Sequence, residues 1–427
     1  MVKYMSLIKN YLDFAIIKAK ILFYRRTIPK RVVSLRKKEH IRTVFMLSDV
    51  SLWKTEGLFI AMREHPRFLP ILAVTPMNAV PASEPNKRYN RLKDYLHEKG
   101  YDFVEINKDN FKSLNPNIIL YQQPYEGFLP KELSFREVIN NALVVHVAYG
   151  IHTLSAIPKH SFSDDQPLHR YAWQLYMENE ETLVCGKYTL LKGSNMVVTG
   201  VPMQDLLISS IGLKNTSWKS QSSKKKRIIW APHHTLPIKG AYNFINLSTF
   251  LDVYEIMLEM ADMYKDTVQF AFKPHPFLKK KLYFYWGKEK TEAYYAEWSN
   301  RENTQISEGE YLNLFSNSDA LIHDCNSFQV EYCYTCKPCL FLIHPHNINN
   351  QLDELNDFGK RVFRMHDFGI TRDDIEAFIL RVVSGEDIRK QERESLFNNY
   401  LCPPNNKTAS ENIINAILGE EEYANIN

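Results

Sequence analysis

The order of apolar segments along the chain is the feature that most limits how it can fold. From residue 42 onward, short runs rich in β-branched and aromatic residues alternate with longer stretches whose apolar residues recur at helical spacing. Such alternation predicts parallel sheets covered by helices on both faces. The strands expected in the first half are Thr43–Leu47, Leu69–Val74, Asp102–Ile106, Asn117–Tyr121, Leu143–Ala148 and Met196–Thr199, with helices at Ser51–Glu64, Asn86–Glu98 and Pro167–Asn179.

The alternation stops at residues 212–226 and then starts again. This stretch is rich in Ser and Lys and has no periodicity, so it is the best candidate for a linker. The strands expected after it are Arg227–Ala231, Val268–Phe272, Ala320–His323 and Cys339–Ile343, with helices at Leu251–Met263, Glu310–Phe315, Ser327–Tyr334, Asp373–Val383 and Glu411–Leu418.

We therefore expect an α/β protein with two doubly wound, Rossmann-like domains that face each other across a cleft. A chain of 427 residues is long enough for two such domains. Ligands of open α/β sheets bind beyond the carboxyl ends of the strands. The expected division is an extension at 1–40, domains at 41–211 and 227–400, the linker at 212–226, and a C-terminal helix at 401–427 that packs back.

The positive charge of the chain is concentrated at its N-terminus. Residues 1–42 hold twelve Lys and Arg against Asp13 and Glu39, so the rest of the chain is acidic. Apolar residues from Tyr4 to Phe23 recur at helical spacing between lysines, which leaves no run long enough to span a bilayer and no signal peptide. A basic amphipathic helix suits an anionic membrane surface. The alternative is a helix docked on its own protein with solvated lysines.

The interior of the chain lacks the basic residues interleaved with aromatics that nucleic-acid binding requires, so no nucleic acid is expected as a partner. Six cysteines without regular spacing do not form a disulfide framework and indicate a reducing, cytoplasmic compartment. Cys333, Cys336 and Cys339 have a spacing found in metal sites, but no Gly-containing turn separates them. Buried packing is the expected role of these thiols, and no metal or other cofactor is expected.

Two segments carry side chains suited to phosphate. After the strand at 268–272, the sequence Lys273-Pro274-His275-Pro276 holds a histidine between two prolines, which prevent helix formation. His275 is a candidate phosphate donor or acid/base catalyst, although a single histidine is more often structural. After the strand at 320–323, Asp324, Asn326 and Ser327 form a strand-to-helix turn, which suits either a phosphate or simple capping.

Three weaker segments have the same strand-then-turn form. They contain Pro232, His233 and His234 after one strand, Tyr149 and Gly150 with His146 and His152 after another, and a Gly-Pro turn before Asp205 after a third. No Walker loop, G-x-G-x-x-G, H-E-x-x-H or G-x-S-x-G motif occurs, which excludes several large enzyme classes.

Taken together, the segments YG, VTGVPMQD, WAPHHT, FKPHP and SDALIHDCNS…VEY…KPCLF resemble the CDP-glycerol glycerophosphotransferases, the teichoic-acid and capsule polymerases and primases with a GT-B fold. The pair KPHP and SDxLIxDxxS is the most specific part. The resemblance implies an N-terminal acceptor domain, a C-terminal nucleotide-donor domain, and His275 at the donor's phosphate. It further implies donor contacts from Lys273, Pro232, His233, His234, Asp324, Asn326, Ser327 and Glu331, and places Asp205 near the interdomain crossing.

The chain departs from the family at three places. The family's His-Gly pair, with the histidine as base, is Tyr149-Gly150 here, which leaves His146 or His152 as other candidates. Pro-Thr-Trp-Arg is replaced by Pro232-His-His-Thr, and the Arg of the Gly-x-Pro-Arg segment by Met203.

The resemblance implies a transferase that moves glycerol phosphate, or a related polyol phosphate, from a CDP-activated donor to a glycan or lipid-linked hydroxyl and releases CMP. It would work in the cytoplasm, at the inner face of the cell membrane. One alternative is a GT-B glycosyltransferase that uses a nucleotide sugar. Another is a degenerate, non-catalytic GT-B scaffold that binds a glycan.

Overall fold

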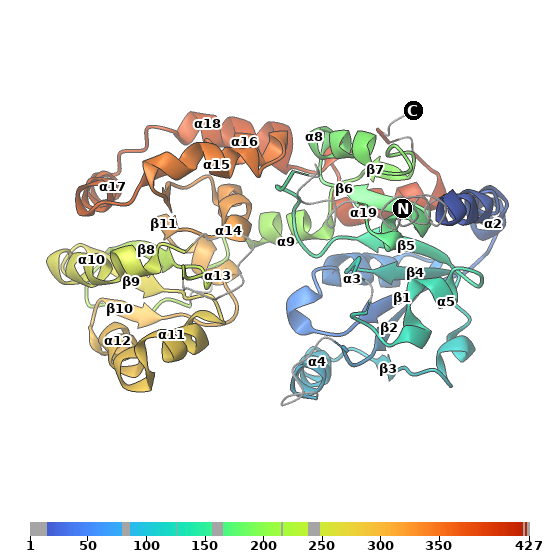
Figure 1. Cartoon of the computed structure of the whole chain (residues 1–427), viewed down its shortest axis with the longest axis horizontal. Coiled ribbons are helices and arrows are strands. Elements are labelled where there is room, and N and C mark those ends of the chain that lie inside the picture. The colour runs from blue at the N-terminus through green and yellow to red at the C-terminus, as the bar shows by residue number, and fades with distance from the viewer. Residues whose placement is uncertain are drawn as a thin grey trace, which may run out of the picture. The chain divides into compact units, whose positions relative to one another are not determined.

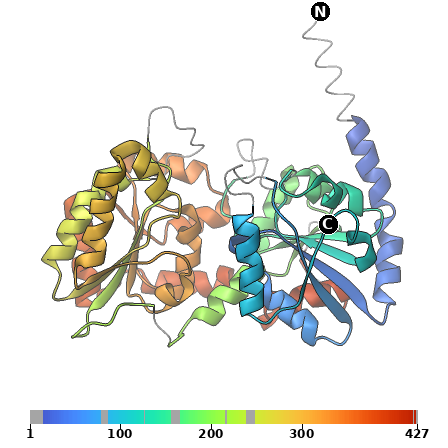
Figure 2. The same ribbon diagram turned by 90° about the horizontal axis from the view of Figure 1, so that it is seen from below.

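The structure is a computed structural model that describes residues 15–78, 86–125, 127–155, 165–214, 217–237, 248–421 and 423–424. The chain divides into two compact units. Unit 1 comprises Met1–Gly150, Ala156–Leu206 and Pro403–Asn427, and unit 2 comprises Ile151–Ser155 and Leu207–Cys402. Each unit has one parallel sheet with helices on both of its faces (Figures 1 and 2). Two parallel α/β sheets therefore confirm the predicted fold class.

The sheet of unit 1 has the strand order β3-β2-β1-β4-β5-β6-β7, and all pairings are parallel. The chain builds β1, β2 and β3 in one direction and then returns to place β4 on the other side of β1. The strand bounds are β1 Ile41–Leu47, β2 Phe68–Val74, β3 Phe103–Glu105, β4 Ile118–Tyr121, β5 Leu143–Val147, β6 Gln174–Met177 and β7 Met196–Val198. The helix bounds are α2 Ile28–Arg36, α3 Glu56–Glu64, α4 Lys87–Glu98, α5 Phe135–Val138, α7 Pro167–Tyr171, α8 Glu180–Leu183, α9 Pro202–Ser210, which runs into unit 2, and α19 Ala409–Leu418.

The sheet of unit 2 repeats this arrangement with the order β10-β9-β8-β11-β12-β13, again parallel throughout. The strand bounds are β8 Lys226–Ala231, β9 Val268–Phe272, β10 Thr304–Ile306, β11 Ala320–His323, β12 Cys339–Leu342 and β13 Asp367–Gly369. The helix bounds are α10 Phe250–Met263, α11 Leu278–Trp286, α12 Lys288–Asn300, α13 Leu312–Ser316, α14 Asn326–Glu331, α15 Ile348–Asp353, α16 Asp357–Phe363, α17 Arg372–Ser384 and α18 Lys390–Leu396.

One predicted helix is wrong. The prediction of a helix over Pro167–Asn179 is correct only as far as Tyr171, because α7 ends there and β6 follows. β6 lies between β5 and β7, and Leu175, Tyr176 and Met177 are buried in the core. A short apolar run buried on both faces has no periodicity of its own, so the sequence could not distinguish strand from helix.

The segment predicted as a linker at 212–226 is anchored to unit 2 at residues 218 and 219, although most of its described residues are exposed. Trp218 is buried, and its indole N–H donates to the Leu314 carbonyl at 3.1 Å. The Lys219 N–H donates to the Gln305 side chain at 2.6 Å. These contacts attach the segment to unit 2, and the division between the units falls earlier, between Leu206 and Leu207.

The N-terminal segment docks on unit 1 over much of its described length. Residues 15–25 are helical, and Ile21 and Tyr24 are buried in the core of the unit, as are Ile28 and Leu35 further along. The Arg25 side chain donates to the Ala172 carbonyl at 2.9 Å. The part of the predicted stripe from Tyr4 to Leu12 lies outside the described residues. Among the described helices, none is long and apolar enough to cross a bilayer.

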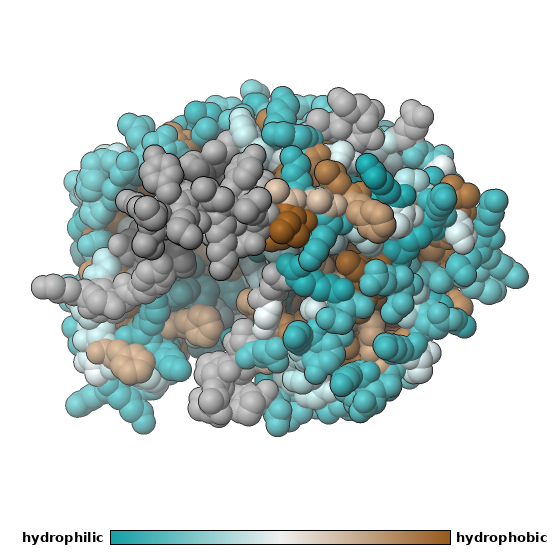
Figure 3. Space-filling view, turned by 45° about the vertical axis from the view of Figure 1, so that its right-hand side comes forward, coloured by the Kyte–Doolittle hydropathy of each residue, from teal (hydrophilic) through white to brown (hydrophobic). Residues whose placement is uncertain are grey.

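Hydrophilic residues cover most of the face seen in Figure 3, and the hydrophobic residues on it form small separate groups. Scattered groups of this kind are normal on a protein surface.

The C-terminal helix α19 belongs to unit 1, beside elements from the start of the chain (Figure 1). The Arg36 side chain donates to the carbonyl of Ile417 at the end of α19. Asp205 accepts hydrogen bonds from the N–H groups of Ala409 and Ser410 at 2.7 and 2.9 Å and from the Ser410 hydroxyl at 2.7 Å. Its carboxylate therefore satisfies backbone donors that the first turn of a helix leaves free.

Replacing Asp205 with Ala should lower the free energy of unfolding by about 1–2 kcal/mol, the usual cost of losing a helix cap. Urea unfolding at pH 7 measures this loss. The matched control is Asp373→Ala in the first turn of α17, because the Asp373 side chain is 95% exposed. Equal stability of the two variants would contradict the capping role of Asp205.

Candidate functional site

Three histidines meet at the carboxyl ends of two neighbouring strands of unit 2. His233 and His234 follow β8, and His275 follows β9. The two loops are tied together because the His275 N–H donates to the Pro232 carbonyl at 3.1 Å. The ring centroids are 4.4 Å apart for His233 and His234, 4.9 Å for His233 and His275, and 4.1 Å for His234 and His275. We call these three side chains the histidine cluster.

The histidine cluster holds neutral imidazoles. Burial lowers the pKa of His233 to about 3, of His234 to about 4 and of His275 to about 3. The positive charge of Lys281, on α11, lowers the pKa of each ring further. An anion placed among the rings would reverse both effects, because it favours the charged form of an imidazole.

The hydrogen bonds of His275 decide which nitrogen carries its proton. The Phe277 N–H donates to Nδ1 of His275 at 3.1 Å, so the neutral ring must carry its proton on Nε2. Nε2–H is then free to donate to an acceptor such as a phosphate oxygen. Nitrogens of the three rings lie within 4.8 Å of one another, a spacing that three metal ligands could share. A metal ligand needs an unprotonated nitrogen, so the Nε2–H of His275 suits an anion better than a cation.

Asp324 holds in place the loop that carries His233 and His234. Its carboxylate is fully buried and accepts hydrogen bonds from the His233 N–H at 2.5 Å, the Thr249 N–H at 2.7 Å and the Thr249 hydroxyl at 3.1 Å. Burial raises the pKa of Asp324 to about 6, although these hydrogen bonds act in the opposite direction. Both oxygens are occupied within the protein, so Asp324 supports the loop and the start of α10 rather than facing a ligand.

Lys273 is the second buried charge of this region. Its ammonium donates to the Gly309 carbonyl at 2.9 Å and lies 5.7 Å from the centre of the Tyr311 ring. Burial lowers the pKa of Lys273 to about 8, and the nearby Glu310, Glu308 and Glu331 partly offset this. Glu331 is itself 8% exposed, and its charge helps to raise the pKa of Tyr311. Lys273 and Glu331 thus share one buried network around Tyr311.

Asn326 and Ser327 begin α14, which has only six residues. The Asn326 side chain accepts a hydrogen bond from Gln351 at 2.8 Å, whereas Ser327 is exposed. Ser327 is therefore the more accessible of the two.

The candidate bases fall into different units. Tyr149 and Gly150 belong to unit 1, and Tyr149 is 37% exposed. His146 is 5% exposed, with its ring 4.7 Å from that of His169, so it lies inside unit 1. His152 belongs to unit 2, within a segment held by hydrogen bonds to the loop before α16: Asn356 donates to the His152 carbonyl at 3.1 Å.

Of the three cysteines with metal-like spacing, two are buried in unit 2 and Cys336 is half-buried. Cys333 and Cys339 are buried, and the Cys333 thiol contacts the Gln329 carbonyl at 3.2 Å. Burial raises the pKa of Cys336 to about 11. All six cysteines are free.

Sequence reasoning missed two residues of this site. Thr249 binds Asp324 from 75 positions away, and no local pattern marks such a contact. Lys281 lies close enough to act on all three imidazoles. The sequence feature that could have revealed Lys281 is the basic run Lys279-Lys280-Lys281, which follows His275 at the start of α11.

Solved structures share this fold at low sequence identity. S. aureus MnaA with UDP has a TM-score of 0.57 at 14% identity, covering 91% of this chain and 100% of that one. UDP-GlcNAc 2-epimerase from Neisseria meningitidis has a TM-score of 0.54 at 13% identity, covering 90% and 100%. The wall teichoic acid polymerase TagF has a TM-score of 0.52 at 14% identity, covering 96% and 98%. The class of protein is thus a GT-B-type α/β chain. No curated protein matches it.

Residues 169–419, more than half of the chain, match the family described as CDP-Glycerol:Poly(glycerophosphate) glycerophosphotransferase. The chain belongs to this family, and the predicted resemblance is confirmed. It is a transferase of the glycerophosphotransferase type. The matched region includes the whole histidine cluster.

Acid should destabilise the protein through the histidine cluster. The pKa of each ring is lowered in the folded state. The free energy of unfolding therefore has its full value above about pH 6.5, the ordinary pKa of histidine, and decreases as the pH falls toward 3–4. Each imidazole that must charge contributes a slope of at most about 1.4 kcal/mol per pH unit.

Urea unfolding between pH 7.5 and 5.0 tests this on the wild type and on the double variant His233→Gln/His234→Gln. The variant should lose less stability on acidification. The exposed His40, replaced by Gln, serves as the control. An acid dependence that is identical in the wild type and the double variant would contradict the assignment.

Proposed function

We propose that this chain transfers glycerol phosphate, or a related polyol phosphate, from a CDP-activated donor to a hydroxyl of a glycan or lipid-linked acceptor. The acceptor oxygen attacks the phosphorus that carries the polyol, and a new phosphodiester bond forms. The bond between the two phosphates breaks, and CMP leaves with the electron pair. Membership of the family supports the type of reaction, while donor and acceptor are our proposal.

The observation that carries the proposal is the histidine cluster with its protonated Nε2 on His275. Phosphoryl transfer depends mainly on positioning and on stabilising the charge of the phosphate oxygens. The cluster lies at the carboxyl ends of β8 and β9, where α/β sheets bind ligands. His275 donates to the phosphate, with the Lys281 charge nearby, so the reaction needs no metal for charge stabilisation. The loop carrying His233 and His234 keeps this arrangement because Asp324 holds it.

We assign the base that removes the acceptor proton to His152. His146 is buried inside unit 1, whereas His152 is partly exposed. His152 lies in the same unit as His275, on a segment anchored to the loop before α16. An imidazole is suited to take a proton near neutral pH.

Replacing His275 with Ala should lower the rate of CMP release from CDP-glycerol by roughly 10²–10³-fold, the usual effect of removing one donor to a developing charge. His152→Ala should lower kcat, because the acceptor hydroxyl then loses the group that takes its proton. His40→Ala is the matched control, and EDTA should leave the rate unchanged.

CDP-ribitol, UDP-sugars and CMP-sugars form the comparison arms of this assay. Turnover of a nucleotide sugar alone would show a glycosyltransferase instead. A wild type that turns over no donor would indicate a binding scaffold.

We further propose that the N-terminal helix holds the enzyme at the cytoplasmic face of an anionic membrane. Within the described part of this helix, Ile21 and Tyr24 face unit 1, whereas Ile16, Ile17 and Phe23 are 52%, 44% and 72% exposed. Lys18 and Lys20 are exposed as well. Apolar groups among lysines suit the boundary of an anionic bilayer.

The double variant Ile16→Ser/Phe23→Ser should reduce sedimentation with vesicles of phosphatidylglycerol and phosphatidylcholine several-fold. The wild type should bind pure phosphatidylcholine vesicles weakly, and added salt should weaken binding to the anionic ones. Ile388→Ser, at an apolar side chain of unit 2 that is 62% exposed, is the control. Unchanged binding of the double variant would contradict this role of the helix.

A further inference from the structure

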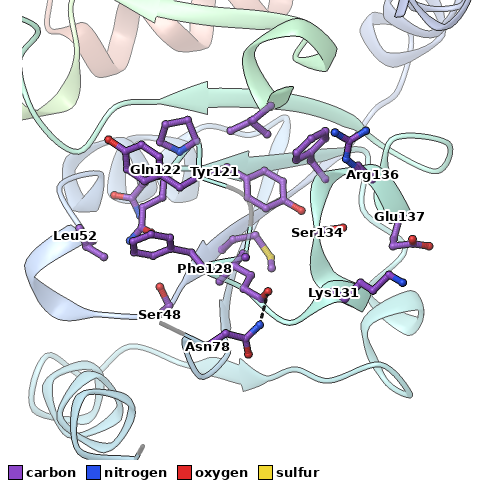
Figure 4. A pocket seen from close by; sticks show the side chains of 18 of the residues that line it. Ser48, Leu52, Asn78, Tyr121, Gln122, Phe128, Lys131, Ser134, Arg136 and Glu137 are labelled. Carbon is purple, nitrogen blue, oxygen red and sulfur yellow. Dashed lines mark hydrogen bonds between the residues drawn. The ribbon is translucent and has the colours of Figure 1, made fainter. Parts of the chain in front are cut away.

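Unit 1 contains a cavity of about 310 Å³ at the carboxyl ends of its central strands (Figure 4). Ser48 and Leu52 line it from the segment after β1, and Tyr121 and Gln122 line it from the end of β4. β1 and β4 are neighbours in the sheet although the chain builds β2 and β3 between them. The strand order reverses at this pair, and a reversal point of this kind is where open α/β sheets bind ligands.

The walls of the cavity are aromatic and held in place. Tyr121, Tyr125, Phe128 and Phe135 line it, and the rings of Tyr125 and Phe128 lie 5.5 Å apart, inclined at 38°. The Tyr121 hydroxyl donates to the Leu133 carbonyl at 2.9 Å, which fixes its ring.

Asn78 closes one side of the same cavity. Its N–H donates to the Phe128 carbonyl and its side chain to the Leu129 carbonyl, both at 2.8 Å. The second of these bonds is drawn in Figure 4. The cavity therefore has its shape before any ligand arrives.

One polar atom on these walls has no hydrogen-bond partner among the described residues. The Gln123 side-chain oxygen is buried and has no hydrogen bond to any residue that the structure describes. The Gln122 oxygen accepts the Lys54 N–H at 3.0 Å, which orients its amide and leaves the NH₂ group to donate elsewhere. The Ser48 side chain borders the same space (Figure 4). Buried polar groups without partners destabilise a protein, so a ligand that pairs with them gains affinity.

These features select one chemical class of ligand. Aromatic walls favour the apolar face of a ring, and an acceptor beside two donors favours hydroxyl groups, since each hydroxyl both donates and accepts. An alkyl chain would leave the amides unpaired. Four charged residues line the cavity. Lys131, Arg136 and Glu137 are exposed and include both signs. The fourth, Asp49, is buried and its carboxylate pairs with Ser51 and Arg88, so the lining offers no concentrated positive charge to an anion. The volume is at the small end of ligand sites, roughly 300 Å³, which suits one ring rather than a chain of rings.

We propose that this cavity binds a single sugar ring; under the function proposed above, on which this identification rests, the ring is the end of the acceptor glycan. A pyranose ring places its C–H face on Phe128 and Tyr125 and its hydroxyls toward Gln122, Gln123 and Ser48. Unit 1 then recognises the acceptor by shape and hydroxyl pattern rather than by charge.

Saturation-transfer NMR on the full chain, without any nucleotide, tests this. The probes are the methyl glycosides of glucose, galactose, N-acetylglucosamine and N-acetylmannosamine, with cytidine and decyl phosphate as competing classes. At least one glycoside should bind, and Gln123→Leu should weaken it at least tenfold. Phe128→Ala should do the same, and Gln123→Leu, with a side chain of similar size, keeps the test valid if Phe128→Ala fails to fold. Gln391→Leu, at an exposed glutamine of unit 2, should leave binding unchanged.

Binding of no glycoside, binding of cytidine or decyl phosphate alone, or equal glycoside binding by wild type and Gln123→Leu would each overturn the proposal. The readout contains no CDP-glycerol, so loss of the phosphotransfer assignment leaves the sugar-binding result standing. Conversely, CMP release that depends on His275 in a protein that binds no sugar would overturn the cavity alone.

Discussion

The buried carboxylate of Asp324 is the interaction on which the proposed donor site depends. It lies at the end of β11 and accepts three hydrogen bonds, from the loop after β8 and from the start of α10. A carboxylate excluded from water is stable only if such donors replace its hydration. The bond from the His233 N–H holds the loop that carries His233 and His234, so the cost of burying Asp324 is coupled to the geometry of the histidine cluster.

The two proposed sites lie at the carboxyl ends of parallel strands, but at different pairs of strands. In unit 1 the aromatic rings and amides, which suit a hydroxylated ring, lie at β1 and β4, where the strand order reverses. In unit 2 the imidazoles and the charge of Lys281, which suit a phosphate, lie at β8 and β9, next to the reversal between β8 and β11. The side chains that distinguish the two proposed sites thus lie in the loops that follow the strands rather than in the strands themselves.

Patterns of neighbouring residues predicted those strands and helices that depend on neighbouring residues alone. The strand at Val268–Phe272 was predicted with its observed bounds, because a buried apolar run ends at Lys273-Pro274. The strand at Gln174–Met177 was missed since its apolar residues continue those of α7 without a break. The short strands β10 and β13 lie at the edges of their sheet and were missed because each has a single large apolar residue and therefore forms no apolar run. Trp218 made the supposed linker part of unit 2, through a contact with Leu314 that no spacing reveals.

The sequence by itself determined the class of fold and the family motifs, and it identified His275 as a candidate site residue. It could do so because strand-forming runs, prolines and residue types act locally. Tertiary structure alone decided what surrounds those residues. It brought His233 and His234 to His275, engaged both oxygens of Asp324, buried His146, and separated His152 from Tyr149 into another unit. Burial and hydrogen-bond partners depend on residues distant in the chain, and they set the pKa and accessibility on which the chemistry of each side chain depends.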